Sequence, residues 1–264
     1  MTRILAIANR KGGTGKTATT VNLAAEAAAA GLRTLVVDLD TQGHAGLGFD
    51  VAARRGEPTV HDLFRDPRAG LAGAIRATAT ERVFVAPADP LFDGTAAERS
   101  PTRLARELRG AGLARDFDLV LIDTPPAYDM LLVNALGAAE EVLVPTLPHA
   151  LSADGVSQLA RIVFLVAARV NAELRIAGLL PVMVGANPRH HKLVLDMLAR
   201  DFGAERILPG IRSDIRVAEA FAARCPVRRH APGGRASSDY RRLLAALLDR
   251  FSPKTGGSLA PTFG

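Results

Sequence analysis

Arg10-Lys11-Gly12-Gly13-Thr14-Gly15-Lys16-Thr17 is the stretch of this sequence that decides its fold. Its three glycines and small neighbours allow consecutive backbone N–H groups to turn inward around a chain of phosphates. In such a loop the ammonium of Lys16 reaches the β- and γ-phosphate oxygens, and the hydroxyl of Thr17 ligates Mg²⁺. The stretch departs from the ordinary pattern, because it has a second lysine at position 11 and no glycine at position 10.

The residues on either side of this loop have the pattern that a phosphate-binding loop requires. Residues 4–8 form a short apolar run, which suits a buried parallel strand. Residues 18–30 are rich in alanine and end at Gly31, which predicts a helix. The order of strand, glycine loop and helix points the helix N-terminus at the phosphates.

The rest of the chain alternates between apolar runs and helical stretches. Further strands are predicted at 35–38, 83–86, 119–123, 142–144 and 179–184, with weaker candidates at Ile207-Leu208 and Val227. Helices are predicted near 101–108, 130–139, 153–170, 191–200, 217–223 and 238–251, with a short one at 60–64. Fully apolar strands alternating with helices favour an α/β fold with a mostly parallel sheet covered on both faces.

Composition supports one globular domain. The chain has 264 residues, of which 48% are hydrophobic and 23% charged, enough to bury a sizeable core. We expect a single P-loop NTPase domain over residues 1–251 and a disordered tail at 252–264, because the tail has Ser, Pro, Gly and Thr but no helical period. No apolar run approaches the ~20 residues of a membrane helix, and no secretory signal opens the chain, so a cytoplasmic protein is expected.

Three acidic residues follow predicted strands. Asp123 closes the apolar run 119–122 and precedes Thr124-Pro125-Pro126, whereas Asp38 and Asp40 follow the run 35–37. Because ligands of parallel sheets bind at the carboxyl ends of strands, these carboxylates are expected beside the glycine loop. A carboxylate that ends a strand can hold a Mg²⁺-bound water, which is the role of a Walker B aspartate.

With its lysine at position 11, the loop resembles that of the deviant Walker A ATPases typified by ParA and MinD. The resemblance covers residues 3 to about 251 and implies that ATP and Mg²⁺ are the cofactors. It also implies that Lys11 crosses an ATP-dependent homodimer to the phosphates of the other subunit, so Lys11, Lys16 and Asp40 are the catalytic candidates. The nucleotide contacts that it implies are Lys11, Gly12, Gly13, Thr14, Gly15, Lys16, Thr17 and Ala18.

Residues 35–44 resemble the family's switch I segment. The resemblance implies that Asp40 positions the attacking water and that Asp38 lies near the metal through water, so the metal site is expected at Thr17, Asp38 and Asp123. The sequence differs from relatives at Ala18, Thr41 and His44, where Thr or Ser, Pro and Asn are common. None of these differences removes a charge from the mechanism.

The C-terminal quarter is basic. Residues 187–250 hold 13 of the 33 Lys and Arg residues but only 7 of the 27 Asp and Glu residues, and the remainder is balanced. Arginine suits phosphate recognition, so this region could bind a polyanion. The alternative is a basic face that contacts only solvent. By resemblance to the ParA C-terminal region, Asn187 and Asp214 lie near the adenine, and Arg216 and Arg235 contact DNA.

These observations favour a ParA-type ATPase that dimerises on ATP, binds DNA nonspecifically and positions cargo through hydrolysis stimulated by a ParB-like or other adaptor. Such a protein is cytoplasmic and associates with the nucleoid when ATP is bound. A MinD-like membrane ATPase is an alternative, but residues 252–264 supply no amphipathic helix. A nucleotide-gated switch with negligible turnover also remains open. A single cysteine, Cys225, argues against an iron-protein reductase. The sequence does not identify the cargo or the adaptor.

Overall fold

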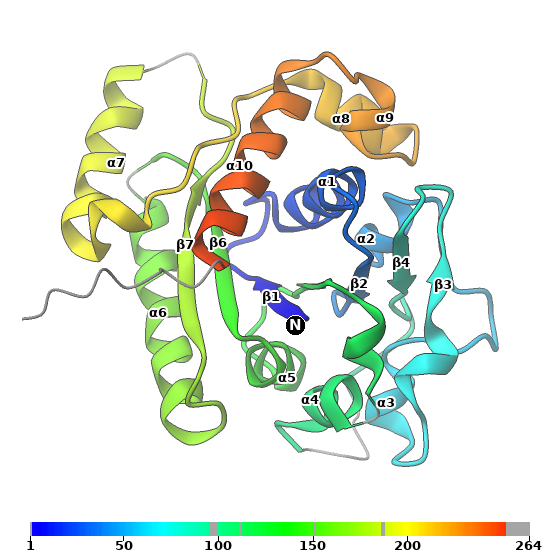
Figure 1. Cartoon of the computed structure of the whole chain (residues 1–264). Coiled ribbons are helices and arrows are strands. Elements are labelled where there is room, and N and C mark those ends of the chain that lie inside the picture. Colours follow the sequence, from blue (N-terminus) through cyan, green and yellow to red (C-terminus); the bar gives the residue numbers. More distant parts are fainter. Residues whose placement is uncertain (1, 95–99, 111, 150, 186–187, 252–264) are drawn as a thin grey trace, which may run out of the picture.

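The computed structural model describes residues 2–94, 100–110, 112–149, 151–185 and 188–251. Its centre is a seven-stranded sheet in the order β3-β4-β2-β5-β1-β6-β7 (Figure 1). The strands are β1 (Arg3–Ile7), β2 (Thr34–Asp38), β3 (Arg76–Ala77), β4 (Val83–Ala86), β5 (Leu119–Asp123), β6 (Glu141–Thr146) and β7 (Arg175–Pro181). Every pairing is parallel except that of the two-residue edge strand β3 with β4, which confirms the predicted mostly parallel sheet.

Helices connect the strands. The α-helices are α1 (Lys16–Ala29), α2 (His44–Leu47), α3 (Asp62–Arg65), α4 (Arg103–Ala105), α5 (Met130–Ala138), α6 (Leu151–Arg169), α7 (Pro188–Phe202), α8 (Ile215–Ala222), α9 (Val227–His230) and α10 (Arg235–Phe251). Short 3₁₀ or π turns lie at Leu71–Ala74, Arg106–Gly110, Leu113–Asp116 and Ala204–Arg206. Among the described residues, no helix has both the length and the apolar character needed to cross a membrane.

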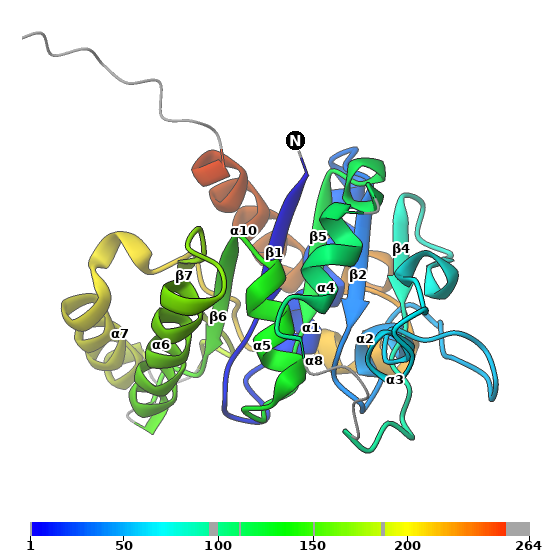
Figure 2. The same ribbon diagram turned by 90° about the horizontal axis from the view of Figure 1, so that it is seen from below.

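The sheet separates two hydrophobic layers, and alternate residues of each strand supply them. On β1, Ile4 and Ala6 belong to the layer formed with α4, α5, α6 and α7, whereas Leu5 and Ile7 belong to the layer formed with α1, α8, α9 and α10. Figure 2 shows helices on both sides of the strands. Because both faces are covered, the strands read as continuous apolar runs in the sequence.

Two predicted strand segments differ in the structure. Val227 begins helix α9, so the prediction of a strand there was wrong. Pro226 caps this helix at φ −61°, and the side chain of Asn22 accepts a hydrogen bond from the Val227 N–H at 2.7 Å, so the segment turns onto α1 instead of joining the sheet. Ile207 makes only an isolated parallel bridge to Leu179. The tail at 252–264 lies outside the described residues, and its disorder stays a prediction.

Candidate functional site

The glycine loop lies between the carboxyl end of β1 and the start of α1. Gly13 and Gly15 have φ values of +73° and +75°, in the left-handed region that favours glycine. Asn9 fixes the start of the loop, because its amide donates to the Pro145 carbonyl at 2.7 Å and its side-chain oxygen accepts from the Lys11 N–H at 3.0 Å. The Thr14 hydroxyl closes the turn by donating to the Lys11 carbonyl at 3.2 Å. Sequence analysis missed the role of Asn9, whose only signal is its position as the first polar residue after the strand.

The two lysines of the loop have different surroundings. Lys16 is 7% exposed, and burial lowers its pKa although the carboxylates of Asp123 and Asp40 act to raise it. Lys11 is partly exposed and has no acidic partner among the described residues. Lys16 is therefore fixed within the site, whereas the ammonium of Lys11 remains available to an anion.

Asp123 connects β5 to the helix that follows the loop. Its two carboxylate oxygens accept hydrogen bonds from the Thr17 hydroxyl at 2.7 Å and the Thr20 hydroxyl at 3.0 Å. Thr20 was not a predicted site residue, although it lies three residues after Thr17 and hence on the same helix face. The structure thus places Thr17 and Asp123 together, and a metal shared by this hydroxyl and this carboxylate stays a prediction.

Asp38 ends β2 and lies directly beside Asp123 in the parallel register of β2 and β5. Its Oδ2 accepts a hydrogen bond from the Gly46 N–H at 2.9 Å, whereas its buried Oδ1 has no hydrogen-bond partner in the described part of the chain. Burial and the neighbouring Asp123 raise the pKa of Asp38 well above its usual value, and burial raises the pKa of Asp123 to about 6. Burial thus disfavours the ionised form of both carboxylates, and a cation bound between them would favour that form again.

The residues present fit Mg²⁺. The donors are a hydroxyl and carboxylates, which are the hard oxygen ligands that Mg²⁺ prefers, and the unpaired Oδ1 of Asp38 is free to bind a metal-bound water. The described residues contain no cluster of three or more His, Cys, Asp or Glu side chains suited to a metal. Mg²⁺ is usually held by one or two carboxylates together with substrate phosphates and water.

Asp40 lies just beyond the sheet, in the loop between β2 and α2. It is partly exposed, and its Oδ1 accepts a hydrogen bond from the Gln42 N–H at 3.1 Å. Its charge is close enough to Lys16 to act on the pKa of that ammonium. The structure therefore brings Asp40 to the same edge of the sheet as Lys16, Asp38 and Asp123.

A mostly apolar cavity of about 490 Å³ adjoins the loop at Gly15 and Ala18, between α1 and α8. Asp214 lines it, but the carboxylate of this residue also caps α8 by accepting from the Arg216 N–H at 3.1 Å. Asn187, the other predicted adenine contact, lies outside the described residues. Other residues that line the cavity are Val21, Val182, Met183, Ile211, Val217, Phe221 and Cys225.

Many arginines of the basic C-terminal quarter are engaged in ion pairs. Arg212 and Arg242 pair with the buried Asp239, Arg228 and Arg241 pair with the buried Glu26, and Arg224 pairs with Asp50. By contrast, Arg216, Arg229 and Arg235 are exposed, and no acidic partner is found for them within the ranges that the structure describes.

The two predicted DNA contacts lie at one junction of the fold. Arg235 begins α10 and donates to the Ser213 carbonyl at 3.4 Å, just before α8. Arg216 is on α8, and its Nη1 would lie 3.3 Å from a Cβ built on Gly234. The free positive charge of this quarter is therefore smaller than its composition suggests, and part of it gathers at the α8–α10 junction.

Comparisons with known proteins identify the relatives of this chain. A protein-family model described as an AAA domain matches residues 2–176. The chain is 37% identical over 250 residues to the chromosome-partitioning ATPase Soj of Thermus thermophilus, covering 94% of this chain and 96% of that protein. It is 34% identical over 245 residues to the sporulation initiation inhibitor protein Soj of Bacillus subtilis, with 91% and 96% covered.

A solved structure has the same fold. It is a Mycobacterium smegmatis protein described as cobyrinic acid a,c-diamide synthase, with a bound ATP analogue and magnesium. It superposes with a TM-score of 0.80 at 30% identity, and 96% of each chain is covered. A chain of similar sequence and fold therefore binds an adenine nucleotide with magnesium.

Proposed function

Since this chain belongs to the ParA/MinD family of P-loop ATPases, we propose that it is a partition or positioning ATPase that hydrolyses ATP to ADP and phosphate. One observation carries the proposal: Lys16, Thr17, Asp38 and Asp123 converge at the carboxyl edge of the sheet, while Lys11 has no acidic partner among the described residues. The Soj proteins of T. thermophilus and B. subtilis, similar over nearly the whole chain, support the partition role.

The site holds the nucleotide by charge and by backbone donors. The loop N–H groups and Lys16 bind the phosphates, and the apolar cavity beside Gly15 and Ala18 receives the nucleoside. Thr17, Asp38 and Asp123 would hold Mg²⁺, which would supply positive charge to offset that of the phosphates. Asp40 orients the attacking water, since phosphoryl transfer depends on positioning and on electrostatic stabilisation.

Lys11 is the residue that makes the active unit a dimer. Its ammonium contacts the phosphates bound by a second copy of the chain, so two ATP molecules are held between two subunits. The surroundings of Lys11 support this role, because a lysine already paired with a carboxylate of its own subunit would have to break that pair first. Dimerisation therefore depends on the γ-phosphate, and hydrolysis separates the subunits.

The ATP-bound dimer binds DNA without sequence preference through Arg216 and Arg235. Both side chains are exposed at the α8–α10 junction and have no acidic partner in the described ranges. Contacts to backbone phosphates carry no sequence information, and they weaken steeply as salt rises. In the cell the dimer is cytoplasmic and associated with the nucleoid, and an adaptor protein of the ParB kind stimulates hydrolysis and releases it.

The test measures binding to a random-sequence DNA fragment with ATP, with ADP and without nucleotide, at two salt concentrations. The double variant Arg216→Ala, Arg235→Ala should lose the ATP-dependent binding. Arg54→Ala, Arg55→Ala removes the same charge from two exposed arginines of another region and should bind like the parent. Equal binding by both double variants would contradict the assignment of the surface. No binding with any nucleotide would overturn DNA as the partner and make anionic vesicles the next ligand to test.

A further inference from the structure

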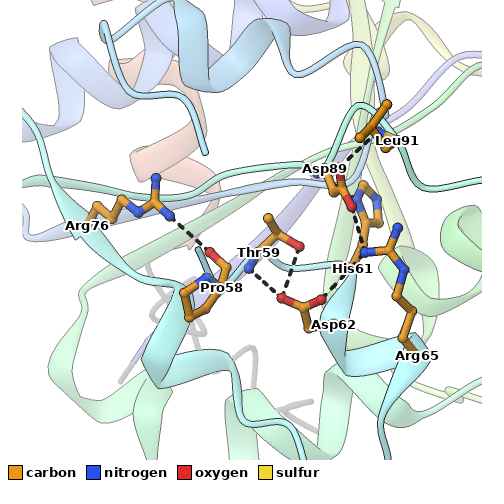
Figure 3. A network of polar contacts seen from close by, with 8 residues as sticks. All are labelled: Pro58, Thr59, His61, Asp62, Arg65, Arg76, Asp89 and Leu91. Atoms are coloured by element: carbon orange, nitrogen blue, oxygen red, sulfur yellow. Dashed lines mark hydrogen bonds and ion pairs between the residues drawn. The ribbon is translucent and has the colours of Figure 1, made fainter. Parts of the chain in front are cut away.

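His61 is a fully buried histidine that the proposed chemistry does not use. It precedes α3 and lies in a network of polar contacts that also includes Thr59, Asp62, Arg65 and Asp89 (Figure 3). A turn fixes the backbone here, because the carboxylate of Asp62 accepts from the Thr59 N–H at 2.7 Å and the Val60 N–H donates to the Pro87 carbonyl at 3.0 Å. The backbone that carries the imidazole is therefore fixed by contacts other than those of the ring itself.

Both ring nitrogens of His61 are hydrogen-bonded to backbone groups. Nδ1 accepts from the Asp89 N–H at 2.9 Å, and Nε2 lies 3.3 Å from the Leu39 carbonyl oxygen. A carbonyl oxygen can only accept, so Nε2 carries the proton, and an N–H can only donate, so Nδ1 does not. The geometry thus requires a neutral ring with its proton on Nε2. Burial lowers the pKa of His61 to about 4, which agrees with a neutral ring.

Neighbouring side chains prevent the ring from turning. The imidazole stacks on the Phe92 ring, with centroids 4.5 Å apart and planes 1° from parallel. Arg65 lies over the other residue of this stack, 5.0 Å from the Phe92 centroid, and its guanidinium pairs with Asp89 at 2.6 Å. Figure 3 shows His61, Arg65 and Asp89 close together. The donor of His61 is therefore held in one direction.

The Nε2–H of His61 bonds to Leu39, the residue between Asp38 and Asp40. The Leu39 N–H donates to the Asp123 carbonyl at 3.0 Å, and the Leu39 carbonyl accepts from His61. Leu39 is thus bound on one side to β5 and on the other to His61, and the next residue in the chain is Asp40. Of these two bonds, only the one from His61 is made by a side chain.

We infer that His61 is a positioning residue for Asp40: by holding the Leu39 carbonyl, it fixes where the chain leaves β2 and hence where the Asp40 carboxylate stands. The inference rests on the proposed role of Asp40 in orienting water. A misplacement of about 1 Å can slow an enzymatic reaction roughly 100-fold. Lys16 and Thr17, which bind the nucleotide in the proposed function, make no hydrogen bond to His61 within the described ranges. Loss of the His61 bond therefore lowers the hydrolysis rate and leaves ATP affinity unchanged.

Two substitutions separate the two bonds of the ring. His61→Gln places an amide N–H near the position of Nε2 and keeps the bond to Leu39, whereas His61→Asn places an amide oxygen near Nδ1 and keeps the bond to Asp89. Single-turnover hydrolysis of γ-labelled ATP, with protein in excess, gives the rate even when turnover is slow. We expect His61→Asn to be slower than the parent by about tenfold or more and His61→Gln to stay within about twofold.

The same preparations give the controls. Affinity for a fluorescent ATP analogue should stay within about twofold of the parent in both variants, and urea unfolding shows whether their stabilities match. Phe92→Leu removes the ring stack that orients the imidazole, so it should lose stability and also slow hydrolysis, though less than His61→Asn, while ATP affinity stays within about twofold of the parent. Rates that fall equally in His61→Gln and His61→Asn, or in neither, would overturn the inference.

Two further measurements are needed. The first tests the inference without any substitution that could affect folding, and the second distinguishes failure of the inference from failure of the proposed function. Nitrogen-15 spectra of the unsubstituted protein report the histidine tautomer, and a proton on Nδ1 of His61 would refute the inference without any substitution. Asp40→Ala is measured alongside. If it hydrolyses ATP at the parent rate, the proposed function of Asp40 fails and the inference fails with it. If Asp40→Ala is slow but His61→Asn is as fast as the parent, only the inference fails.

Discussion

Arg228→Gln should destabilise the protein although the side chain lies on the surface. Glu26 is in the middle of α1 and only 3% exposed, and its Oε2 lies 2.7 Å from Arg228 on α9 and 3.5 Å from Arg241 on α10. Its other oxygen, Oε1, is buried without a hydrogen-bond partner in the described residues. The carboxylate therefore depends on these two arginines for all of its ion pairing in the described structure.

The size of the destabilisation follows from the dependence of the buried Glu26 carboxylate on these two arginines. Removing one partner of a fully buried pair costs about 3–5 kcal/mol, because a buried charge is left without compensation. Here the Arg228 side chain is 38% exposed and Arg241 remains nearby, so solvent and the second arginine reduce the cost to about 2 kcal/mol. Glu26→Gln removes the charge itself and should cost about 1 kcal/mol or less.

Urea unfolding followed by circular dichroism measures these free energies. Arg229→Gln is the matched control, since Arg229 is the next residue, exposed, and has no acidic partner among the residues that the structure describes; it should change stability by less than about 0.5 kcal/mol. The double variant Glu26→Gln, Arg228→Gln should be more stable than Arg228→Gln alone. Equal effects of the two arginine substitutions would refute the reasoning.

Four other outcomes are expected. Lys16→Ala should abolish ATP binding or turnover, and normal ATPase activity in that variant would remove Lys16 from the site. Lys11→Ala should bind ATP but form no ATP-dependent dimer, so a dimer that persists in light scattering contradicts the cross-subunit role. Asp40→Ala should accumulate as an ATP-bound dimer, which size-exclusion chromatography detects. The pKa of His61 is about 4 when folded, with Asp62, Arg65 and Asp89 the charged groups facing it, against an ordinary 6.5. Because the unfolded chain binds the proton first, the contribution of His61 to stability is lost as pH falls below about 6.5, by about 2 kcal/mol from pH 7 to pH 5. An identical pH dependence of unfolding in His61→Gln would contradict this.

The central part of the fold could be predicted because its signals are local. The apolar runs before the glycine loop, before Asp38 and before Asp123 are strands, and the rule that ligands bind at carboxyl ends brings these residues to one edge of the sheet. Helix α1 begins at Lys16, two residues before the predicted start. By contrast, the strand at Val227 was wrong because a β-branched residue after proline suits a strand or a helix start equally well.

The missed site residues depend on contacts between segments far apart in the chain. Asn9 acts by bonding to Pro145, and His61 acts by bonding to Leu39 and Asp89, so neither role has a local pattern. The pairing of charged side chains also depends on such distant contacts. Composition predicts a basic C-terminal quarter, but only the structure shows that Arg212, Arg228 and others are paired with carboxylates.

Asp38 and Asp123 end central strands of the sheet, whereas Asp40 stands in a loop that is held by a histidine from another segment. With the roles that we propose for these residues, nucleotide affinity and the lifetime of the ATP-bound state depend on different parts of the molecule. Substitutions around residues 59–65 and 89–92 can lengthen or shorten that lifetime while the phosphate contacts stay the same. Under the proposed function, such residues offer a way for related chains to hydrolyse ATP at different rates with one unchanged nucleotide site.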